Sequence, residues 1–206
     1  MIEVHNLTFG YSSKDEANIL RGVDFAAQTG KLTAVIGTNG AGKSTLIKVL
    51  GGIYQADEGE IFIQGKKAEI HNAFDAQKNG VAIIHQELVL VPYMTVAENI
   101  FLGHLPGKYF VNKKKLNEQT EALFKSLSLP VIAPHVRMKT LSIAQIQMVE
   151  IVKAISYKSQ IIVMDEPTSA IADAEVEMLF GIIRRLTAAG ISVIYISHKM
   201  DEIFRI

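Results

Sequence analysis

The chain has 206 residues, enough for one substantial domain or two small ones, and 49% of them are hydrophobic, as expected for a globular protein with a real core. It has no cysteine, which excludes a disulfide framework and a thiolate metal site. Basic and acidic residues balance at 21 each, so a dominant nucleic-acid-binding surface is disfavoured. No apolar run in the sequence reaches the length of a membrane span, and any role at a membrane therefore has to come through a partner.

The first 85 residues read as a series of strands with one helix among them. Apolar and β-branched runs separated by turn-forming residues predict strands at residues 2–11, 19–27, 31–36, 60–64 and 81–85. A helix is predicted over residues 45–50, close behind the third strand, and Gly51 and Gly52 can end it.

A phosphate-binding loop is predicted between that third strand and the helix. Residues 37–45 read Gly-Thr-Asn-Gly-Ala-Gly-Lys-Ser-Thr, which fits the spacing G-x-x-x-x-G-K-[ST]. The glycines allow a tight turn whose N–H groups point into one cavity, and a helix beginning near Lys43 adds its positive end. Lys43 can reach the β- and γ-phosphates, and the Ser44 hydroxyl can bind Mg²⁺. A chance glycine-rich turn is disfavoured because strand, loop and helix follow in the order that the motif requires. The residues predicted to contact the nucleotide here are Gly37, Thr38, Asn39, Gly40, Ala41, Gly42, Lys43, Ser44 and Thr45.

From residue 86 to about residue 158 the strand-like runs fade. Segments 96–102, 113–127 and 142–157 look helical and are separated by prolines. Ser142 and Gln145 have the spacing of a capping box, which marks a helix N-terminus. The helix end is either only well capped or is also a second anion-binding site.

The last part of the chain alternates again between strands and helices. Strands are predicted at 161–164 and 191–196, a helix at 173–189, and a short helix from about residue 199. This alternation predicts a largely parallel sheet covered by helices. Because such a sheet usually continues into a further strand, we expect the chain to be a fragment of a longer protein.

Two acidic residues stand where the strand 161–164 ends. A carboxylate at the tip of a buried strand is well placed beside a phosphate-binding loop, so Asp165 would hold Mg²⁺, directly or through water. Glu166 would polarise the attacking water, since phosphoryl transfer mainly requires positioning and charge stabilisation. The plain alternative is a solvated acidic strand end. His198 follows the strand 191–196, which could carry it to the γ-phosphate.

The motifs in this order resemble the ATP-binding-cassette (ABC) ATPases, the nucleotide-binding subunits of ABC transporters, over essentially the whole chain. Residues 37–45 resemble the Walker A motif, 141–145 the signature, 161–166 Walker B with its catalytic glutamate, and 169–173 the D-loop. The resemblance implies an α/β fold of the P-loop NTPase type: a RecA-like, mostly parallel sheet with an antiparallel β part and a helical insert. It implies one nucleotide-binding domain over 1–206, with a catalytic core at 1–85 and 159–206 and a helical signature subdomain at 86–158.

The resemblance also implies roles for residues outside the phosphate-binding loop. The implied catalytic residues are Glu166, His198 and Gln86, and the implied Mg²⁺ ligands are Ser44, Gln86 and Asp165. Further implied contacts with ATP are Tyr11, Ser142, Ala144, Gln145 and Asp173. Tyr11 stands where the family has the aromatic that stacks on adenine, and Phe9 is a rival for that role. Thr38 replaces a proline common in the family, and Ala144 replaces a signature glycine.

Residues 86–103 and 141–151 are similar to bacterial monosaccharide importers of the ribose, galactose and xylose type. In that subfamily two cassettes usually follow each other in one polypeptide, and each ATP lies between Walker A of one cassette and the signature of the other. The implied partners are a second cassette, in tandem or as a homodimer, membrane permease subunits and indirectly a sugar-binding protein, with no nucleic acid. The implied location is the cytoplasmic face of a bacterial membrane. The alternative is a non-transport cassette that acts on ribosomes or DNA, but the basic arms or charged linkers expected of one are not visible.

Overall fold

The computed structural model describes residues 1–11, 18–86, 90–106 and 111–206. Its strands form two four-stranded sheets. The antiparallel sheet has the order β2-β1-β4-β5, with β1 (Ile2–Phe9), β2 (Leu20–Ala27), β4 (Glu58–Ile63) and β5 (Lys66–Lys67). The parallel sheet has the order β3-β8-β7-β6, with β3 (Leu32–Ile36), β6 (Val81–Ile84), β7 (Ile161–Asp165) and β8 (Ser192–Ser197). The predicted combination of a parallel core with an antiparallel β part is therefore confirmed.

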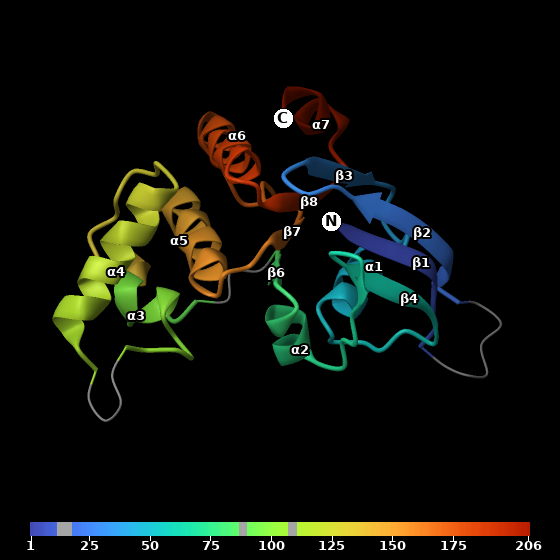
Figure 1. The fold of residues 1–206 in the computed structure, drawn as a ribbon. Coiled ribbons are helices and arrows are strands. Elements are labelled where there is room, and N and C mark those ends of the chain that lie inside the picture. The colour runs from blue at the N-terminus through green and yellow to red at the C-terminus, as the bar shows by residue number, and fades with distance from the viewer. Residues whose placement is uncertain (12–17, 87–89, 107–110) are drawn as a thin grey trace.

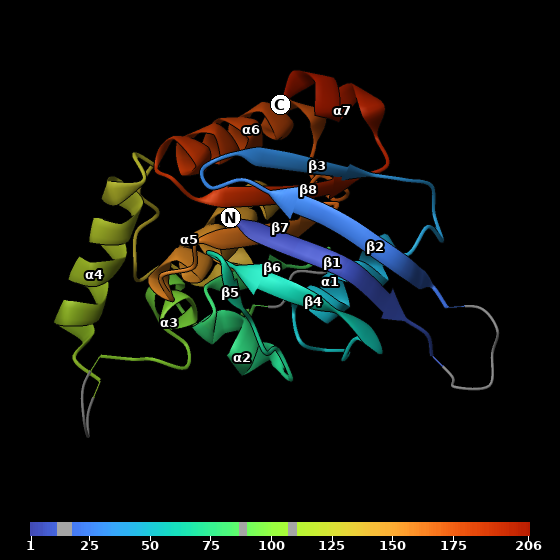
Figure 2. The same cartoon turned by 45° about the vertical axis from the view of Figure 1, so that its right-hand side comes forward.

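The helices lie between and around these sheets. They are α1 (Lys43–Leu50), α2 (Ala73–Lys78), α3 (Val96–Ile100), α4 (Lys113–Ser126), α5 (Ile143–Ser156), α6 (Asp173–Ala188) and α7 (Met200–Arg205), with a 3-10 turn at Met138–Thr140. The helices α3, α4 and α5 gather at one end of the molecule and the antiparallel sheet lies at the other (Figure 1). The helices α6 and α7 lie along one side of the parallel sheet, beside β3 and β8 (Figure 2).

Hydrophobic burial explains why the parallel strands read as continuous apolar runs. All six residues of β8 are buried, and so are the first four of β7. Such strands are covered on both faces, so the usual alternation of apolar and polar residues disappears. The helix α1 packs between the two sheets, where Leu46, Ile47, Val49 and Leu50 share one hydrophobic cluster with residues of both.

A second hydrophobic cluster continues from the other face of the parallel sheet into the helical insert. It joins β6, β7 and β8 to α3, α4, α5 and α6 without a break. The insert is thus anchored on the sheet by buried apolar side chains, and its treatment as a separate subdomain over 86–158 stays a prediction. None of the helices in the described part of the chain has both the length and the apolar character of a membrane span.

The strands and long helices predicted from the sequence are present, while β5, α2 and the 3-10 turn were not predicted. The helix α2 has only six residues and is capped by the Asn72 side chain, which accepts a hydrogen bond from the Asp75 N–H. Ala76 is the one buried residue of this helix, so α2 has no apolar stripe that the sequence could show.

Candidate functional site

The loop between β3 and α1 has the geometry that binds phosphate. Gly40 and Gly42 adopt φ values of 82° and 86°, a left-handed conformation that other residues take only with strain. The Lys43 ammonium lies over the loop and donates to the carbonyls of Gly37 at 2.6 Å and Thr38 at 2.9 Å. Because an ammonium group has three N–H donors, one remains for a phosphate oxygen.

This loop forms one wall of an open cavity of about 450 Å³. Gln86 and Glu166, both predicted as site residues, line the same cavity. The residues around it are Ile19, Asn39, Gly40, Gly42, Lys43, Ser44, Thr45, Gln86 and Glu166. The structure therefore joins the loop to two side chains that are 41 or more positions away in the sequence.

Glu166 and His198 form a hydrogen-bonded pair at the edge of this cavity. His198 Nδ1 lies 2.8 Å from Glu166 Oε1. The two residues follow neighbouring parallel strands, in which Asp165 pairs with Ile196, so the strand ends bring them together. Glu166 has a φ of 45° and donates its N–H to the Ile196 carbonyl at 2.9 Å. The hydrogen bond to Ile196 holds Glu166 in this rarely populated backbone conformation. Residues in such conformations are often found at active sites.

Asp165 is partly buried just before that pair. Burial raises the pKa of its carboxyl group, and the charge of Glu166 raises it further. His85, Lys43 and Lys48 act in the opposite direction. Asp165 directly precedes Glu166, which lines the cavity at the phosphate-binding loop, but Asp165 itself is not among the lining residues.

Ser44, Gln86 and Asp165 together offer a hydroxyl, an amide oxygen and a carboxylate. Oxygen donors of this kind suit Mg²⁺, which keeps several waters and binds through few protein ligands together with phosphate. Among the residues that the structure describes, no group of three His, Asp, Glu or Cys side chains could hold a metal on its own. The donor set therefore fits a cation shared with a bound phosphate.

Tyr11 and Phe9 differ in what their rings can offer. Tyr11 is 60% exposed, and its hydroxyl lies 3.5 Å from Thr45 Oγ1, a contact that lowers the pKa of Tyr11. Phe9 is only 8% exposed and stacks on Tyr54 with ring centroids 5.0 Å apart. An adenine ring could reach a face of Tyr11 far more readily than one of Phe9.

The predicted signature residues stand apart from this cavity. Ser142 caps the N-terminus of α5 with the predicted capping box: its hydroxyl accepts from the Gln145 N–H, and the Gln145 side chain accepts from the Ser142 N–H. Ser142 and Gln145 line a separate hollow of about 620 Å³. Ala144 is 5% exposed within α5, and Asp173 is the first residue of α6. The described cavity at the phosphate-binding loop includes none of these four residues.

A family model described as ABC transporter matches residues 20–169. The chain belongs to the ABC transporter family.

Relatives of this cassette carry names of sugar import proteins. It is 47% identical over its whole length to the galactose/methyl galactoside import ATP-binding protein of Clostridium perfringens. It is 48% identical over 91% of its length to a putative ribose/galactose/methyl galactoside import ATP-binding protein of Burkholderia cenocepacia. The chain spans 39% and 36% of the lengths of these two relatives.

Solved structures give the same fold. A nucleotide-free ATP-binding cassette from an ABC transporter matches with a TM-score of 0.85 and 27% identity, over 100% of this chain and 84% of that one. An ATP-binding cassette in its ADP conformation matches with a TM-score of 0.83 and 29% identity, over the same shares of the two chains. The predicted ABC ATPase fold is therefore confirmed.

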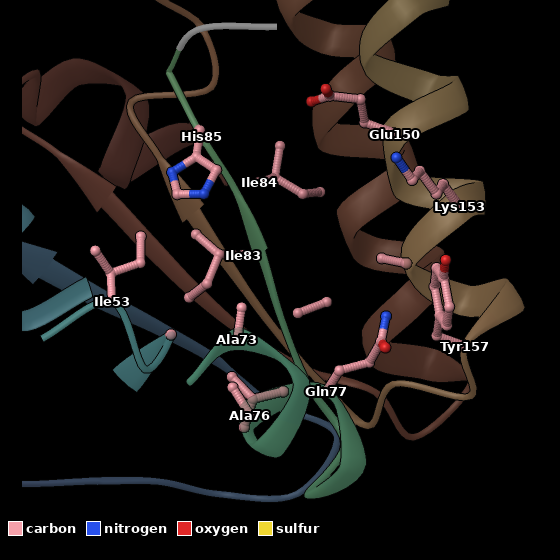
Figure 3. Close-up of a pocket in the computed structure, with 14 residues that line it drawn as sticks. Ile53, Ala73, Ala76, Gln77, Ile83, Ile84, His85, Glu150, Lys153 and Tyr157 are labelled. Atoms are coloured by element: carbon pink, nitrogen blue, oxygen red, sulfur yellow. The ribbon is translucent and has the colours of Figure 1, made fainter. Parts of the chain in front are cut away.

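The cassette has a further pocket of about 270 Å³ that the sequence did not single out. It lies between α2, β6 and α5, and Gly51 and Ile53 also line it. Figure 3 shows Glu150 and Lys153 of α5, and Tyr157 just after its C-terminal end, across from Ala73 of α2. The elements α2 and β6 follow each other closely, but α5 comes much later in the sequence, so no local pattern could have predicted the pocket.

The sequence also did not single out Glu202, a buried carboxylate behind the Glu166–His198 pair. It is 5% exposed, although glutamate in the first turn of a short helix would ordinarily face solvent. Its position four residues after His198 is the only sequence signal that could have drawn attention to it.

Proposed function

We propose that this cassette binds MgATP and hydrolyses it to drive the import of a sugar through a membrane transporter. The observation that carries the proposal is the shared cavity, where the loop around Lys43 faces Glu166, itself hydrogen-bonded to His198 at 2.8 Å. The names of the relatives support sugar import, with galactose, methyl galactoside and ribose as the substrate class.

Phosphoryl transfer is catalysed mainly by positioning and by stabilisation of charge. The N–H groups of residues 37–45 and the Lys43 ammonium would hold the β- and γ-phosphates, with the N-terminal end of α1 adding positive charge. Glu166 would accept a proton from the attacking water, and His198 would fix the carboxylate and contact the γ-phosphate. Ser44, Gln86 and Asp165 would hold Mg²⁺, which neutralises charge on the phosphates when it is bound. Tyr11 would stack on adenine.

The site on this cassette would be one half of a complete site. Ser142, Ala144, Gln145 and Asp173 lie outside the cavity of their own phosphate-binding loop, which supports a role in contacting ATP held by another cassette. The partner would be a second cassette, either in the same polypeptide or as a second copy. Binding of ATP between the two would draw them together, and hydrolysis would let them part.

The remaining proposed partners are membrane permease subunits and, through them, a sugar-binding protein. The pocket between α2, β6 and α5 is lined by apolar side chains such as Ile83 and by the charged Glu150 and Lys153. An amphipathic helix of a permease would suit this lining. The cassette would then sit on the cytoplasmic face of the membrane and would need no nucleic acid.

The central test is Glu166→Gln in the complete protein, purified with the subunits it needs. We expect ATP turnover to fall by about 10²-fold or more, because the amide cannot accept the proton, while ATP binding is retained. Glu118→Gln, at an exposed position on α4, is the matched control and should leave turnover unchanged. If the Glu166→Gln protein turned over ATP at the wild-type rate, Glu166 would not be the catalytic base.

Transport is tested with the protein and its permease in vesicles, with galactose, methyl galactoside and ribose as labelled substrates. We expect ATP-dependent uptake of at least one of them. Recovery of the protein with ribosomes or nucleic acid instead of with a permease would overturn the proposal.

A further inference from the structure

We propose that Glu202 is a positioning residue for ATP hydrolysis. Its carboxylate links the segment after Glu166 to the segment around His198. This inference rests on the proposed function and concerns the same site. It assigns a role to a residue that touches neither the phosphate-binding loop nor the cavity.

The Glu202 carboxylate is a buried centre of hydrogen bonds. Thr168 Oγ1 lies 2.8 Å from both of its oxygens, and the Tyr195 hydroxyl donates to it at 2.9 Å. The Lys199 ammonium donates to it at 3.0 Å, and the Ser197 hydroxyl lies 3.4 Å away. Thr168, Tyr195 and Ser197 are themselves at most 2% exposed. The carboxylate therefore has several donors inside the protein and little contact with water.

The donors come from the segments that hold the catalytic pair. Thr168 follows Glu166 by two positions, while Ser197 and Lys199 flank His198 on either side. One carboxylate on α7 thus bridges the two segments whose side chains meet at 2.8 Å. If either segment moved, the Glu166 carboxylate would change its position relative to the attacking water.

Backbone hydrogen bonds connect the turn after Glu166 to β8, next to the contact that Glu202 makes with Thr168. Glu166 is held in its left-handed conformation by the Ile196 carbonyl, and Ser169 donates its N–H to the Glu166 carbonyl at 3.0 Å. The Thr168 hydroxyl lies within this turn and bonds to the carboxylate of α7. Loss of that bond would remove one of the contacts that hold this turn against β8 and the segment around His198.

General stability is a weak explanation for such a group. A carboxylate removed from water pays a desolvation cost, and a well-packed apolar residue often stabilises a fold as well or better. The hydrogen bonds, in contrast, fix direction and distance, which is what a reacting group requires. The arrangement is therefore better explained by geometry at the active site than by stability.

The test removes the bridge at Thr168 and leaves Glu202 in place. Thr168→Val deletes the hydroxyl, and Thr168→Ser keeps it. Thr120→Val is the stability control, because Thr120 is also fully buried and its hydroxyl donates to a backbone carbonyl in α4, away from the site. The measurements are kcat, KM and ATP affinity in the complete protein, and the melting temperature.

We expect Thr168→Val to lower kcat by about 10-fold with KM and ATP affinity within about 2-fold of wild type, since only positioning is lost. Thr168→Ser should restore kcat, and Thr120→Val should lower the melting temperature while leaving kcat unchanged. If Thr168→Val does not fold, Glu202→Gln is used instead, with the same expected split between kcat and KM.

Equal kcat values for Thr168→Val and Thr168→Ser would overturn the role of Glu202, and so would a loss of kcat in Thr120→Val as large as that in Thr168→Val. Failure of the proposed function looks different. In that case the wild-type protein would show no more ATP turnover than its Glu166→Gln variant.

Discussion

The phosphate-binding loop can be tested through two glycines that have the same backbone conformation in different surroundings. Gly42 and Gly190 both have a φ of 86°. A Cβ at Gly42 would lie 3.1 Å from Leu20 Cδ2 and 3.3 Å from the Ile19 carbonyl oxygen, whereas a Cβ at Gly190 would meet nothing within 4 Å. Alanine at each position therefore separates backbone strain from crowding.

The magnitudes follow from these contacts. The left-handed conformation costs alanine roughly 1–2 kcal/mol, partly offset by about 0.4–1 kcal/mol because the unfolded chain becomes less flexible. Both terms are common to the two variants. Crowding against a backbone carbonyl and a buried leucine adds roughly 1–3 kcal/mol at Gly42 alone. We expect Gly190→Ala to lose about 1 kcal/mol of unfolding free energy and Gly42→Ala about 3 kcal/mol.

The assay is denaturant unfolding of both variants and the wild type, with and without ATP and Mg²⁺. Saturating nucleotide at 100 times Kd stabilises a binding protein by about 2.7 kcal/mol. We expect Gly190→Ala to keep this increment and Gly42→Ala to lose most of it, because Gly42 caps the helix that points at the phosphates. Equal losses in the two variants, or a full nucleotide increment in Gly42→Ala, would refute the reasoning.

Two further predictions concern the aromatic residues and the buried carboxylate. Tyr11→Ala should weaken ATP binding, measured by nucleotide titration, by about 10-fold, with little change in stability because the Tyr11 ring is largely exposed. Phe9→Ala should lower the free energy of unfolding, measured with denaturant, by about 3–5 kcal/mol because the Phe9 ring is buried. Burial raises the pKa of Glu202, but hydrogen bonds from Thr168, Lys199 and Tyr195 outweigh it and hold the pKa below its ordinary value. A carboxylate of this kind stabilises the fold above its unfolded-state pKa and loses that contribution as pH falls through its folded-state pKa. The difference in unfolding free energy between wild type and Glu202→Gln should therefore shrink from about pH 7 to about pH 3, and a difference that grows in acid would contradict the sign.

Much of the fold could be predicted because its signals are local. The strands β7 and β8 are buried on both faces and appear as unbroken apolar runs, and α6 shows a clear apolar face. The capping box of Ser142 and Gln145 predicted the start of α5 correctly. The strand β5 was not predicted because it has only two residues, and α2 was not predicted because Ala76 is its one buried residue, so that it shows no apolar stripe.

The candidate site divides in the same way. The phosphate-binding loop is contiguous in the sequence, and its geometry follows from glycine conformations and a helix start. The sequence placed Glu166 and His198 each after a buried strand, but their pairing was not predicted, because the two residues lie 32 positions apart. The only sequence signal for Glu202 is its position four residues after His198, and that position does not show that its carboxylate is buried.

The sequence by itself determined that this chain builds a phosphate-binding loop on a parallel sheet, because loop, strand and helix carry their information in neighbouring residues. Only the tertiary structure decided which distant side chains complete the site. The register of β7 against β8 brings Glu166 to His198. The packing of α7 brings Glu202 into contact with Thr168 and Lys199, which lie close to that pair in the sequence. These contacts form because whole helices and strands bury apolar surface against one another. A short stretch of sequence cannot predict that packing.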